Sequence, residues 1–365
     1  MKICFILGTR PEIIKLSPLI RECLMRRLSF FIIHTNQHYT ATMDSIFFKE
    51  LKLPQPKYNL HIGSGNHGLQ TGKMLIGIEK ILEEERPNIV FVQGDTNSVL
   101  SGALAASKKP EIILAHVEAG LRSYDKTMPE EMNRIIADHI SSILFAPTRI
   151  QKKILIHEGI SKKNVFVVGN TIVDALAQNL KASKKCIEIF ENLHIKSKKY
   201  ALLTLHRPSN VESKKNLTEI FNAAKIISQQ QNIPVIFPIH PRTEKMIKHF
   251  RITIPSELQI IPPVGYLEML QLLKNTLFVL TDSGGIQEEA CVLRVPCVTL
   301  RKNTERPETI EVGGNILAGY KTASIVSAAK IMLKRKNNWK NPFGDGKSGH
   351  RILKIAISLC FPAKN

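Results

Sequence analysis

The sequence predicts an α/β protein made of two Rossmann-like, doubly wound domains that face a cleft. Short runs rich in Val, Ile and Leu alternate with longer stretches of helical periodicity, which is typical of parallel sheets covered by helices on both faces. The 365 residues also exceed the ~250–300 residues at which a single hydrophobic core stops growing. The alternation restarts after a polar, lysine-rich stretch, Asn179–Lys199, which we expect to link the two domains.

The first domain is expected to span residues 1–180. Its strands are predicted at Lys2–Leu7, Phe30–Thr35, Ile89–Gln93, Ile112–Val117, Ile143–Ala146 and Val165–Val168. Helical patterns lie between them at Ile13–Leu24, Gly68–Glu85 and Asn97–Ser107. Each strand is a nearly continuous apolar run, which indicates a sheet buried on both faces.

The second domain is expected to span residues 181–348. Its strands are predicted at Tyr200–Leu205, Pro234–Pro238, Leu258–Ile261, Phe278–Thr281 and Cys297–Thr299. Its helices are predicted at Asn216–Gln230, Tyr266–Lys274, Gly285–Leu293 and Thr322–Leu333. A last amphipathic helix, within residues 349–362, is expected to return to the first domain.

Composition narrows the class of protein. The net charge is +20, but the lysines are scattered doublets such as Lys108-Lys109, and aromatic residues are only 6%. This favours a solvated basic surface, so no nucleic-acid partner is expected. No apolar run reaches the ~18 residues that predict a membrane-spanning helix, and the first run is too short for a signal peptide. We therefore expect a cytoplasmic protein with no membrane partner.

The six cysteines form no C-x-x-C pair and no Cys/His spacing typical of zinc. We expect all six to be buried, reduced thiols, and no metal site is predicted.

The first strand runs into a turn suited to phosphate. Open parallel sheets bind ligands at the carboxyl ends of their strands. Here Gly8 permits close backbone approach, a helix N-terminus follows, and Arg10 and Lys15 supply positive charge. The segment is not G-x-G-x-x-G, which disfavours a dinucleotide cofactor. A tight turn with a surface arginine is the alternative interpretation.

Carboxylates follow two further strands of the first domain. Asp95 ends one strand and Glu118 ends the next, so neighbouring strands would bring both to one cleft, where they can divide acid and base roles. Asp95 could instead serve as a helix cap. Glu130 and Arg134 stand i, i+4 on a later helix and could pair on one face, which is also what a routine helix salt bridge does.

The second domain carries polar residues at matching positions. His206 and Arg207 follow its first strand, where a histidine suits phosphate binding or proton transfer, or is merely structural. Ser283, Gly284 and Gly285 open a helix after another strand and can cradle a diphosphate. Glu289, further along that helix, can accept sugar hydroxyls. Arg306 fits a phosphate contact or a plain charged loop.

Together these motifs resemble those of the non-hydrolysing UDP-N-acetylglucosamine 2-epimerases. The matching segments span nearly the whole chain in the family's order: Gly8-Thr9-Arg10-Pro11-Glu12, Gln37-His38, Gln93-Gly94-Asp95-Thr96, His116–Arg122, Pro129-Glu130-Glu131 with Asn133-Arg134, His206-Arg207, Thr281–Gly285 with Gln287–Glu289, and Arg306-Pro307-Glu308. The resemblance implies a glycosyltransferase-B-like fold, a homodimer, and interconversion of UDP-GlcNAc and UDP-ManNAc without metal or NAD.

The resemblance also assigns roles to residues. The acid/base candidates are Asp95, Glu118 and Glu130, and which of them acts on which face of the sugar stays open. The groups that would stabilise the leaving diphosphate are Arg10, Lys15, His206, Ser283-Gly284-Gly285 and Arg306. Arg134 is a further substrate-binding candidate. The uracil would lie near Val264–Met269, with contacts at Val264 and Met269, and Glu289 would hold the ribose hydroxyls.

The sequence departs from the family at two places. Pro208-Ser209-Asn210 stands where the family often has a Glu-Asn pair, and Tyr39-Thr40-Ala41-Thr42-Met43-Asp44 replaces a usual arginine and Met-Leu-Asp. Bacterial members bind a second UDP-GlcNAc as an activator, partly through these regions. The candidate activator contacts that remain are Gln37, His38, Arg207 and His240.

Three other activities fit parts of the pattern. A hydrolysing epimerase shares the motifs and would release free ManNAc. A glycosyltransferase on the same fold would use the UDP-sugar as a donor, although the carboxylates of the first domain favour proton abstraction. A basic nucleic-acid-binding module would have no catalytic activity.

Overall fold

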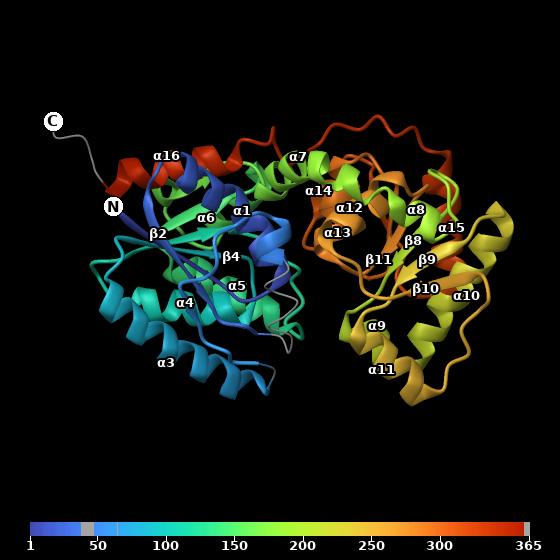
Figure 1. The fold of residues 1–365 in the computed structure, drawn as a ribbon, viewed down its shortest axis with the longest axis horizontal. Coiled ribbons are helices and arrows are strands. Elements are labelled where there is room, and N and C mark those ends of the chain that lie inside the picture. The colour runs from blue at the N-terminus through green and yellow to red at the C-terminus, as the bar shows by residue number, and fades with distance from the viewer. Residues whose placement is uncertain (38–46, 64, 361–365) are drawn as a thin grey trace. The chain divides into compact units, whose positions relative to one another are not determined.

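The computed structural model describes residues 1–37, 47–63 and 65–360. The chain divides into two compact units (Figure 1). The first unit is Met1–Gln178 together with Phe343–Asn365, and the second is Asn179–Pro342. Each unit is an α/β structure around its own parallel sheet.

The first unit contains a seven-stranded sheet of order β3-β2-β1-β4-β5-β6-β7, with every strand pair parallel. The strands are β1 (Lys2–Leu7), β2 (Ser29–His34), β3 (Tyr58–Asn59), β4 (Ile89–Gln93), β5 (Ile113–Val117), β6 (Ile143–Ala146) and β7 (Val165–Val167). The helices are α1 (Arg10–Met25), α3 (His67–Glu85), α4 (Asn97–Ser107), α5 (Pro129–Ile140), α6 (Arg149–His157), η1 (Lys162–Asn164), α7 (Thr171–Ser183) and α16 (Ser348–Cys360). The strand order reverses between β1 and β4, which is where such sheets bind ligands.

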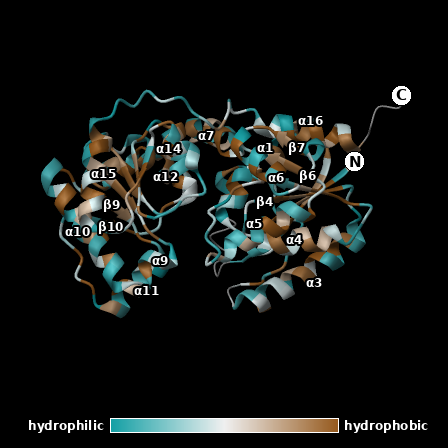
Figure 2. Ribbon diagram, turned by 180° about the vertical axis from the view of Figure 1, so that it is seen from behind, coloured by the Kyte–Doolittle hydropathy of each residue, from teal (hydrophilic) through white to brown (hydrophobic). Residues whose placement is uncertain are grey.

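Apolar strands hold this unit together. β4 is buried along its whole length, and Val92 packs in one cluster with Ile6 of β1 and Val99 of α4. In Figure 2 the strands are mostly hydrophobic, whereas the helices carry both hydrophobic and hydrophilic residues. At the end of β1 the packing is so close that a Cβ on Gly8 would lie 2.0 Å from the Thr35 hydroxyl oxygen. Only glycine fits there, and the turn after β1 therefore lies directly against its neighbours.

The second unit contains a six-stranded parallel sheet of order β10-β9-β8-β11-β12-β13. The strands are β8 (Ala201–Thr204), β9 (Val235–Pro238), β10 (Leu258–Ile261), β11 (Val279–Thr281), β12 (Cys297–Thr299) and β13 (Asn315–Leu317). The helices are η2 (Lys184–Cys186), α8 (Glu188–Asn192), α9 (Pro208–Val211), α10 (Lys214–Gln231), α11 (Pro241–Phe250), α12 (Tyr266–Asn275), α13 (Gly284–Val292), α14 (Pro307–Glu311) and α15 (Thr322–Lys334). Here the order reverses between β8 and β11.

The structure corrects two expectations from the sequence, one about the linker and one about the cysteines. The stretch Asn179–Lys199 is not a plain linker: it ends α7, forms η2 and α8, and buries Ile189 and Ile195 in the second unit's core. Of the six cysteines, Cys186 and Cys360 are half-buried rather than buried, because η2 and the end of α16 lie near the surface. The other four are buried as expected.

The C-terminal helix packs on the first unit. Gly349 of α16 lies so close to α1 that a Cβ there would be 3.1 Å from Cβ of Pro18. Its backbone N–H donates to Asp174 of α7 at 2.9 Å. The chain therefore passes from the first unit to the second and back.

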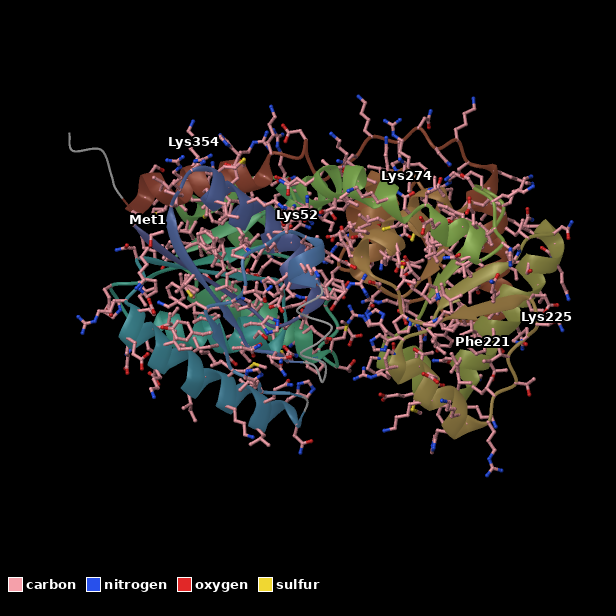
Figure 3. All side chains as sticks on the ribbon, viewed as in Figure 1. Met1, Lys52, Phe221, Lys225, Lys274 and Lys354 are labelled. Carbon is pink, nitrogen blue, oxygen red and sulfur yellow. The ribbon has the colours of Figure 1, made fainter. Side chains whose placement is uncertain are left out.

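Basic side chains lie on the surface of both units. Figure 3 shows labelled lysines, including Lys52, Lys225 and Lys354, on the outside of the ribbon, and all three are exposed. Within the described residues, no helix is long and apolar enough to cross a membrane.

Candidate functional sites in the two units

The turns after β1 and β4 are joined by a buried glutamate. Glu12, in the first turn of α1, is 1% exposed. Its carboxylate accepts from the Gly8 backbone N–H at 3.0 Å and the Thr9 hydroxyl at 2.7 Å, and also from the Thr96 hydroxyl at 2.8 Å. Burial raises its pKa to about 7, although the hydrogen bonds act in the opposite direction. No sequence pattern predicts that Glu12 is buried and hydrogen-bonded to both turns.

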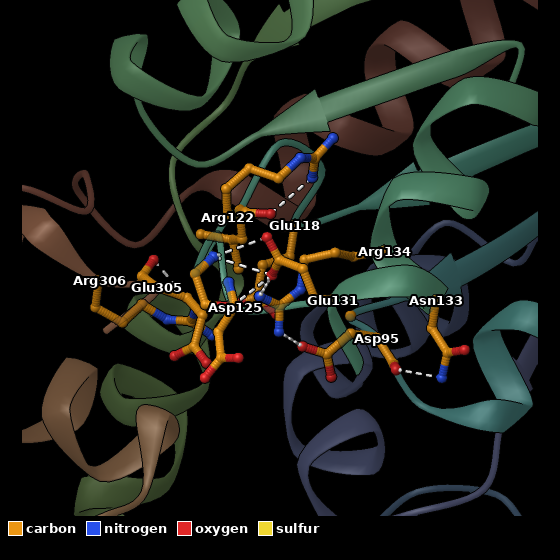
Figure 4. Close-up of polar contacts among 12 residues, drawn as sticks. Asp95, Glu118, Arg122, Asp125, Glu131, Asn133, Arg134, Glu305 and Arg306 are labelled. Atoms are coloured by element: carbon orange, nitrogen blue, oxygen red, sulfur yellow. Dashed lines mark hydrogen bonds and ion pairs between the residues drawn. The ribbon is translucent and has the colours of Figure 1, made fainter. Parts of the chain in front are cut away.

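Asp95 lies in the turn that follows β4. Its carboxylate pairs with Arg134 of α5, while its backbone carbonyl accepts from Asn133 at 3.0 Å (Figure 4). The following residue, Thr96, caps α4 by accepting from Val99 N–H. The capping role that the sequence left open for Asp95 therefore belongs to its neighbour, and the side chain of Asp95 is 28% exposed.

Glu118 follows the adjacent strand, β5. It has a left-handed backbone, with φ of 69°, which is uncommon for a residue other than glycine. Its carboxylate contacts Lys15 and Gln93, and Asn170 donates to it at 3.4 Å. Lys15, expected beside a phosphate, is thus bonded to an acid/base candidate. Since β4 and β5 pair in register, Gln93 opposite Val117, Asp95 and Glu118 follow neighbouring strand ends as predicted.

Two adjacent glutamates of α5 have different environments. Glu131 is 1% exposed, accepts from the backbone of Ser123 and Tyr124, and pairs with Arg134 at 2.6 Å. It therefore fastens the loop before the helix. Glu130, the acid/base candidate, is half-buried. Arg134 thus contacts Glu131, three residues before it on the same helix, and also Asp95, which follows β4. Its contacts therefore extend beyond a single i, i+4 pair.

Arg10 opens α1. Its guanidinium lies over the ring of Phe47, 4.6 Å from the centroid, a cation–π contact. Of the candidate activator contacts, Gln37 accepts from Ser98 at 3.0 Å, and His38 lies outside the described residues.

In the second unit, a buried aspartate organises the turn after β8. Asp282 accepts from the backbone N–H groups of His206 and Arg207 and from the amide of Asn210 at 3.2 Å. Its carboxylate also lies 3.0 Å from Nδ1 of His206. Burial would raise the pKa of Asp282, but the charge and hydrogen bonds of His206 lower it overall. The His206 side chain, 37% exposed, is therefore held through Nδ1.

The turn after β11 presents a helix N-terminus. Ser283 occupies the N-cap position of α13, and its hydroxyl makes no capping bond. Arg306 pairs with Glu288 and lies beside the turn, since a Cβ on Gly284 would be 3.8 Å from Nη2 of Arg306. Gly284, Gly285 and Arg306 therefore combine backbone N–H groups, a helix dipole and a cation, which is an arrangement suited to an anion.

The remaining candidates of this unit are Glu289, Val264, Met269 and His240. Glu289 is buried on α13. Val264 and Met269 are half-buried at the start of α12 and pack on the same core cluster. The ring of His240, which caps α11, lies 5.8 Å from that of His206.

Several residues at these sites received no individual role from the sequence, although all except Asp138 lie in segments that it singled out: Glu12, Gln93, Glu131, Asn133, Asp138, Asn210, Asp282 and Glu288. Most are polar residues within helices, where the sequence pattern does not separate a buried anchor from a solvated side chain. Asp282 is different, because its place at a strand end was a usable signal. Within residues 1–37, 47–63 and 65–360, no three His, Cys, Asp or Glu side chains group so as to hold a metal ion.

The two doubly wound units define the class of protein as a glycosyltransferase-B-like α/β protein. A family model described as UDP-N-acetylglucosamine 2-epimerase matches residues 22–357. The UDP-N-acetylglucosamine 2-epimerase of Methanocaldococcus jannaschii is 58% identical over 361 residues, covering 97% of this chain and 98% of that protein. The Methanococcus maripaludis protein of the same description is 54% identical, with 98% of each chain covered.

The crystal structure of the Methanocaldococcus jannaschii UDP-GlcNAc 2-epimerase with UDP-GlcNAc and UDP is similar, with a TM-score of 0.92 at 57% identity. The match covers 98% of this chain and 99% of that chain. The chain belongs to the UDP-N-acetylglucosamine 2-epimerase family.

Proposed function

We propose that the protein interconverts UDP-GlcNAc and UDP-ManNAc by inverting C2 of the sugar. The observation that carries the proposal is the pair of carboxylates, Asp95 and Glu118, at neighbouring strand ends of the first unit. The second unit supplies an anion-binding turn after β11 and a histidine after β8. Family membership and the similarity to the Methanocaldococcus jannaschii enzyme support the choice of substrate.

The proposed reaction proceeds by elimination and re-addition. A carboxylate removes the C2 proton while the C1–O bond to UDP breaks, which gives 2-acetamidoglucal and UDP. UDP then adds back at C1, and a proton is delivered to C2 from the opposite face. Because C2–H is a poor acid, the reaction depends on stabilising the departing diphosphate. Electrostatic stabilisation of this kind usually contributes more to catalysis than any other single effect.

The residues divide between these tasks. Asp95, Glu118 and Glu130 are the proposed proton carriers. The proposed diphosphate contacts are Arg10, Lys15, His206, Ser283, Gly284, Gly285 and Arg306. Lys15 links the two tasks, because it is bonded to Glu118 and can turn its charge toward the diphosphate when UDP leaves.

The remaining features of the proposal concern substrate contacts and assembly. Arg134 would orient Asp95 and the sugar, Val264 and Met269 would contact the uracil, and Glu289 would accept the ribose hydroxyls. We further infer a homodimer in the cytoplasm, and light scattering that gives a single chain mass at working concentration would contradict the dimer.

The first experiment follows UDP-GlcNAc in D2O by proton NMR, without added metal or NAD. Appearance of UDP-ManNAc with deuterium at C2 and no free ManNAc is the expected result. Free ManNAc with UDP would instead place the protein with the hydrolysing epimerases. Turnover that retains the C2 proton would refute the elimination route.

Two substitutions test the division of tasks. Asp95→Asn should abolish turnover and leave UDP affinity unchanged, whereas Asp345→Asn, which alters an exposed salt bridge with Arg351, should leave turnover unchanged. Arg306→Ala should weaken UDP binding by about tenfold or more, since a charge-assisted contact is worth roughly 1.5–3 kcal/mol. Calorimetry with UDP measures this, and unchanged affinity would remove Arg306 from the site.

A further inference from the structure

A buried histidine lies between two hydrogen-bond acceptors beside the proposed proton carriers. His116, in β5, is fully buried. Its Nδ1 is 2.7 Å from a carboxylate oxygen of Asp138, and its Nε2 is 2.9 Å from the backbone carbonyl of Gly94. A neutral imidazole has one N–H and one bare nitrogen. It could satisfy only one of these acceptors and would turn a lone pair toward the other.

Asp138 does not supply the missing proton. Its carboxylate also accepts from the Gly120 backbone N–H at 3.1 Å and from Arg122 at 2.7 Å, so each further partner is a donor. Burial would raise the pKa of Asp138, but the charges and hydrogen bonds of His116 and Arg122 lower it overall. Nδ1 of His116 therefore faces a carboxylate that already accepts from Gly120 and Arg122, and Nε2 faces the Gly94 carbonyl, which can only accept. To satisfy both acceptors, His116 must carry an N–H group at each nitrogen, which makes the ring an imidazolium.

The surrounding charges balance this cation. Arg122 pairs with Asp138 and, at 2.6 Å, with Glu158 at the end of α6. The cluster therefore contains two cations, His116 and Arg122, and two anions, Asp138 and Glu158. Only Glu158 is substantially exposed, at 25% of its side chain. A buried charge that is paired and hydrogen-bonded on every side is the arrangement in which burial of a charge is tolerated.

The cluster reaches both proposed proton carriers through the backbone. His116 holds the carbonyl of Gly94, the residue before Asp95. Asp138 holds the N–H of Gly120, two residues after Glu118. Both glycines have positive φ, 85° in each case, so each turn adopts a conformation that other residues rarely take.

The turn that carries Asp95 is in fact fixed at every residue. His116 binds the carbonyl of Gly94, Asn133 binds the carbonyl of Asp95, and Glu12 binds the hydroxyl of Thr96. Figure 4 shows Asn133 and Arg134 approaching Asp95 from α5. Of these three contacts, the one from His116 is the one that continues, through Asp138, to the turn of Glu118.

We propose that His116, donating from both ring nitrogens to Asp138 and to the Gly94 carbonyl, is a positioning residue that fixes Asp95 and Glu118 relative to each other. The inference rests on the proposed function, in which both carboxylates handle the C2 proton. Neither His116 nor Asp138 is assigned contact with substrate. This positioning matters because proton transfer requires carboxylates placed to within a fraction of an ångström, and a displacement of 1 Å can cost on the order of 100-fold in rate.

The test compares His116→Gln with His139→Gln, an exposed histidine on α5. Glutamine keeps one N–H for Gly94 but cannot also donate to Asp138. We expect kcat to fall on the order of 100-fold in His116→Gln, and C2 deuterium exchange to fall in parallel. KM and UDP affinity should change less than about threefold, because the proposed UDP contacts at the turn after β11 are untouched. His139→Gln should match the unsubstituted protein.

A second measurement does not depend on the variant folding. In 15N-histidine-labelled protein at neutral pH, both nitrogens of His116, assigned through the contact with Gly94, should carry protons. A neutral His116 would overturn the inference. A normal kcat in His116→Gln would also overturn it, and if Asp95→Asn is inactive at the same time, the proposed function stays intact. Normal turnover in Asp95→Asn would instead refute the proposed function.

Discussion

Glu12 provides a stability prediction that the structure makes quantitative. The side chain is buried and accepts only from neutral donors: the backbone N–H groups of Gly8 and Thr9 and the hydroxyls of Thr9 and Thr96. Glu12→Gln keeps the shape and removes the charge. The amide oxygen can accept from Gly8 and Thr9, and the amide N–H can donate to the hydroxyl oxygen of Thr96, so the fold should be retained.

The magnitude follows from the proton affinity. Burial raises the pKa of Glu12 from 4.5 to about 7, and a tenfold change in proton affinity corresponds to about 1.4 kcal/mol. The folded protein keeps the proton after the unfolded chain has lost it. The stability is therefore fully present below pH 4.5 and falls as the pH rises to about 7. Linkage predicts that the free energy of unfolding decreases by about 2.5 kcal/mol between pH 5 and pH 8 because of Glu12. Glutamine does not titrate, so the variant lacks this decrease.

Urea unfolding of both proteins at pH 5, 6, 7 and 8 measures this difference. Far-UV circular dichroism follows both units, while fluorescence of the single tryptophan, Trp339, follows the second unit. We expect the free energy of unfolding of Glu12→Gln to exceed that of the unsubstituted protein progressively with pH. A difference independent of pH would refute the reasoning, because it would mean that Glu12 is ionised throughout.

Two further predictions concern the turns at the strand ends. Gly8→Ala should destabilise the first unit by several kcal/mol, since its Cβ would overlap two buried hydroxyl oxygens at 2.0 and 2.1 Å. The control Gly72→Ala, at a helical position with no atom within 4 Å of the added Cβ, should instead stabilise the protein by roughly 0.5–1 kcal/mol. Thermal unfolding that ranks the two variants in the other order would contradict this account of the packing. Asp282→Asn should lower kcat at least tenfold by releasing His206. Because the pKa of Asp282 is lowered in the fold, the stability it provides should be present above its ordinary 3.8 and be lost as the pH falls below that value, so the difference in unfolding free energy between the two proteins should shrink in acid.

The positions of the proposed site residues could be predicted because parallel sheets obey a simple rule. Apolar runs such as Ile89–Gln93 identify buried strands, and ligands bind where those strands end. Asp95, Glu118 and His206 each follow a strand within one or two residues. The two strands that the sequence did not predict, β3 and β13, are only two and three residues long and lie at sheet edges. Too few residues are present there for a pattern to be visible.

The supporting contacts could not be predicted, because they depend on residues far apart in the chain. Glu130 and Glu131 are chemically identical neighbours, and only the fold of the Ser123–Tyr124 loop shows that Glu131 is the buried anchor. Asp138 stands 22 residues from His116, on the amphipathic helix α5, where a charged residue ordinarily faces water.

The two units use a buried carboxylate in the same way, but the two carboxyl pKa values shift in opposite directions. In each, the turns beside the strand-order reversal are tied by a buried carboxylate that accepts backbone N–H groups: Glu12 beside β1 and β4, and Asp282 beside β8 and β11. Desolvation is the largest influence on both pKa values and raises each of them. Glu12 meets only neutral donors, so its pKa stays raised. Asp282 lies against the ring of His206, and its interactions with that ring and with the backbone N–H groups of the turn lower its pKa overall. The histidine beside Asp282 therefore accounts for the opposite directions of the two pKa shifts. Replacing His206 with an uncharged residue should raise the pKa of Asp282, as burial does for Glu12, and a carboxyl titration of that variant with the pKa still low would contradict this account.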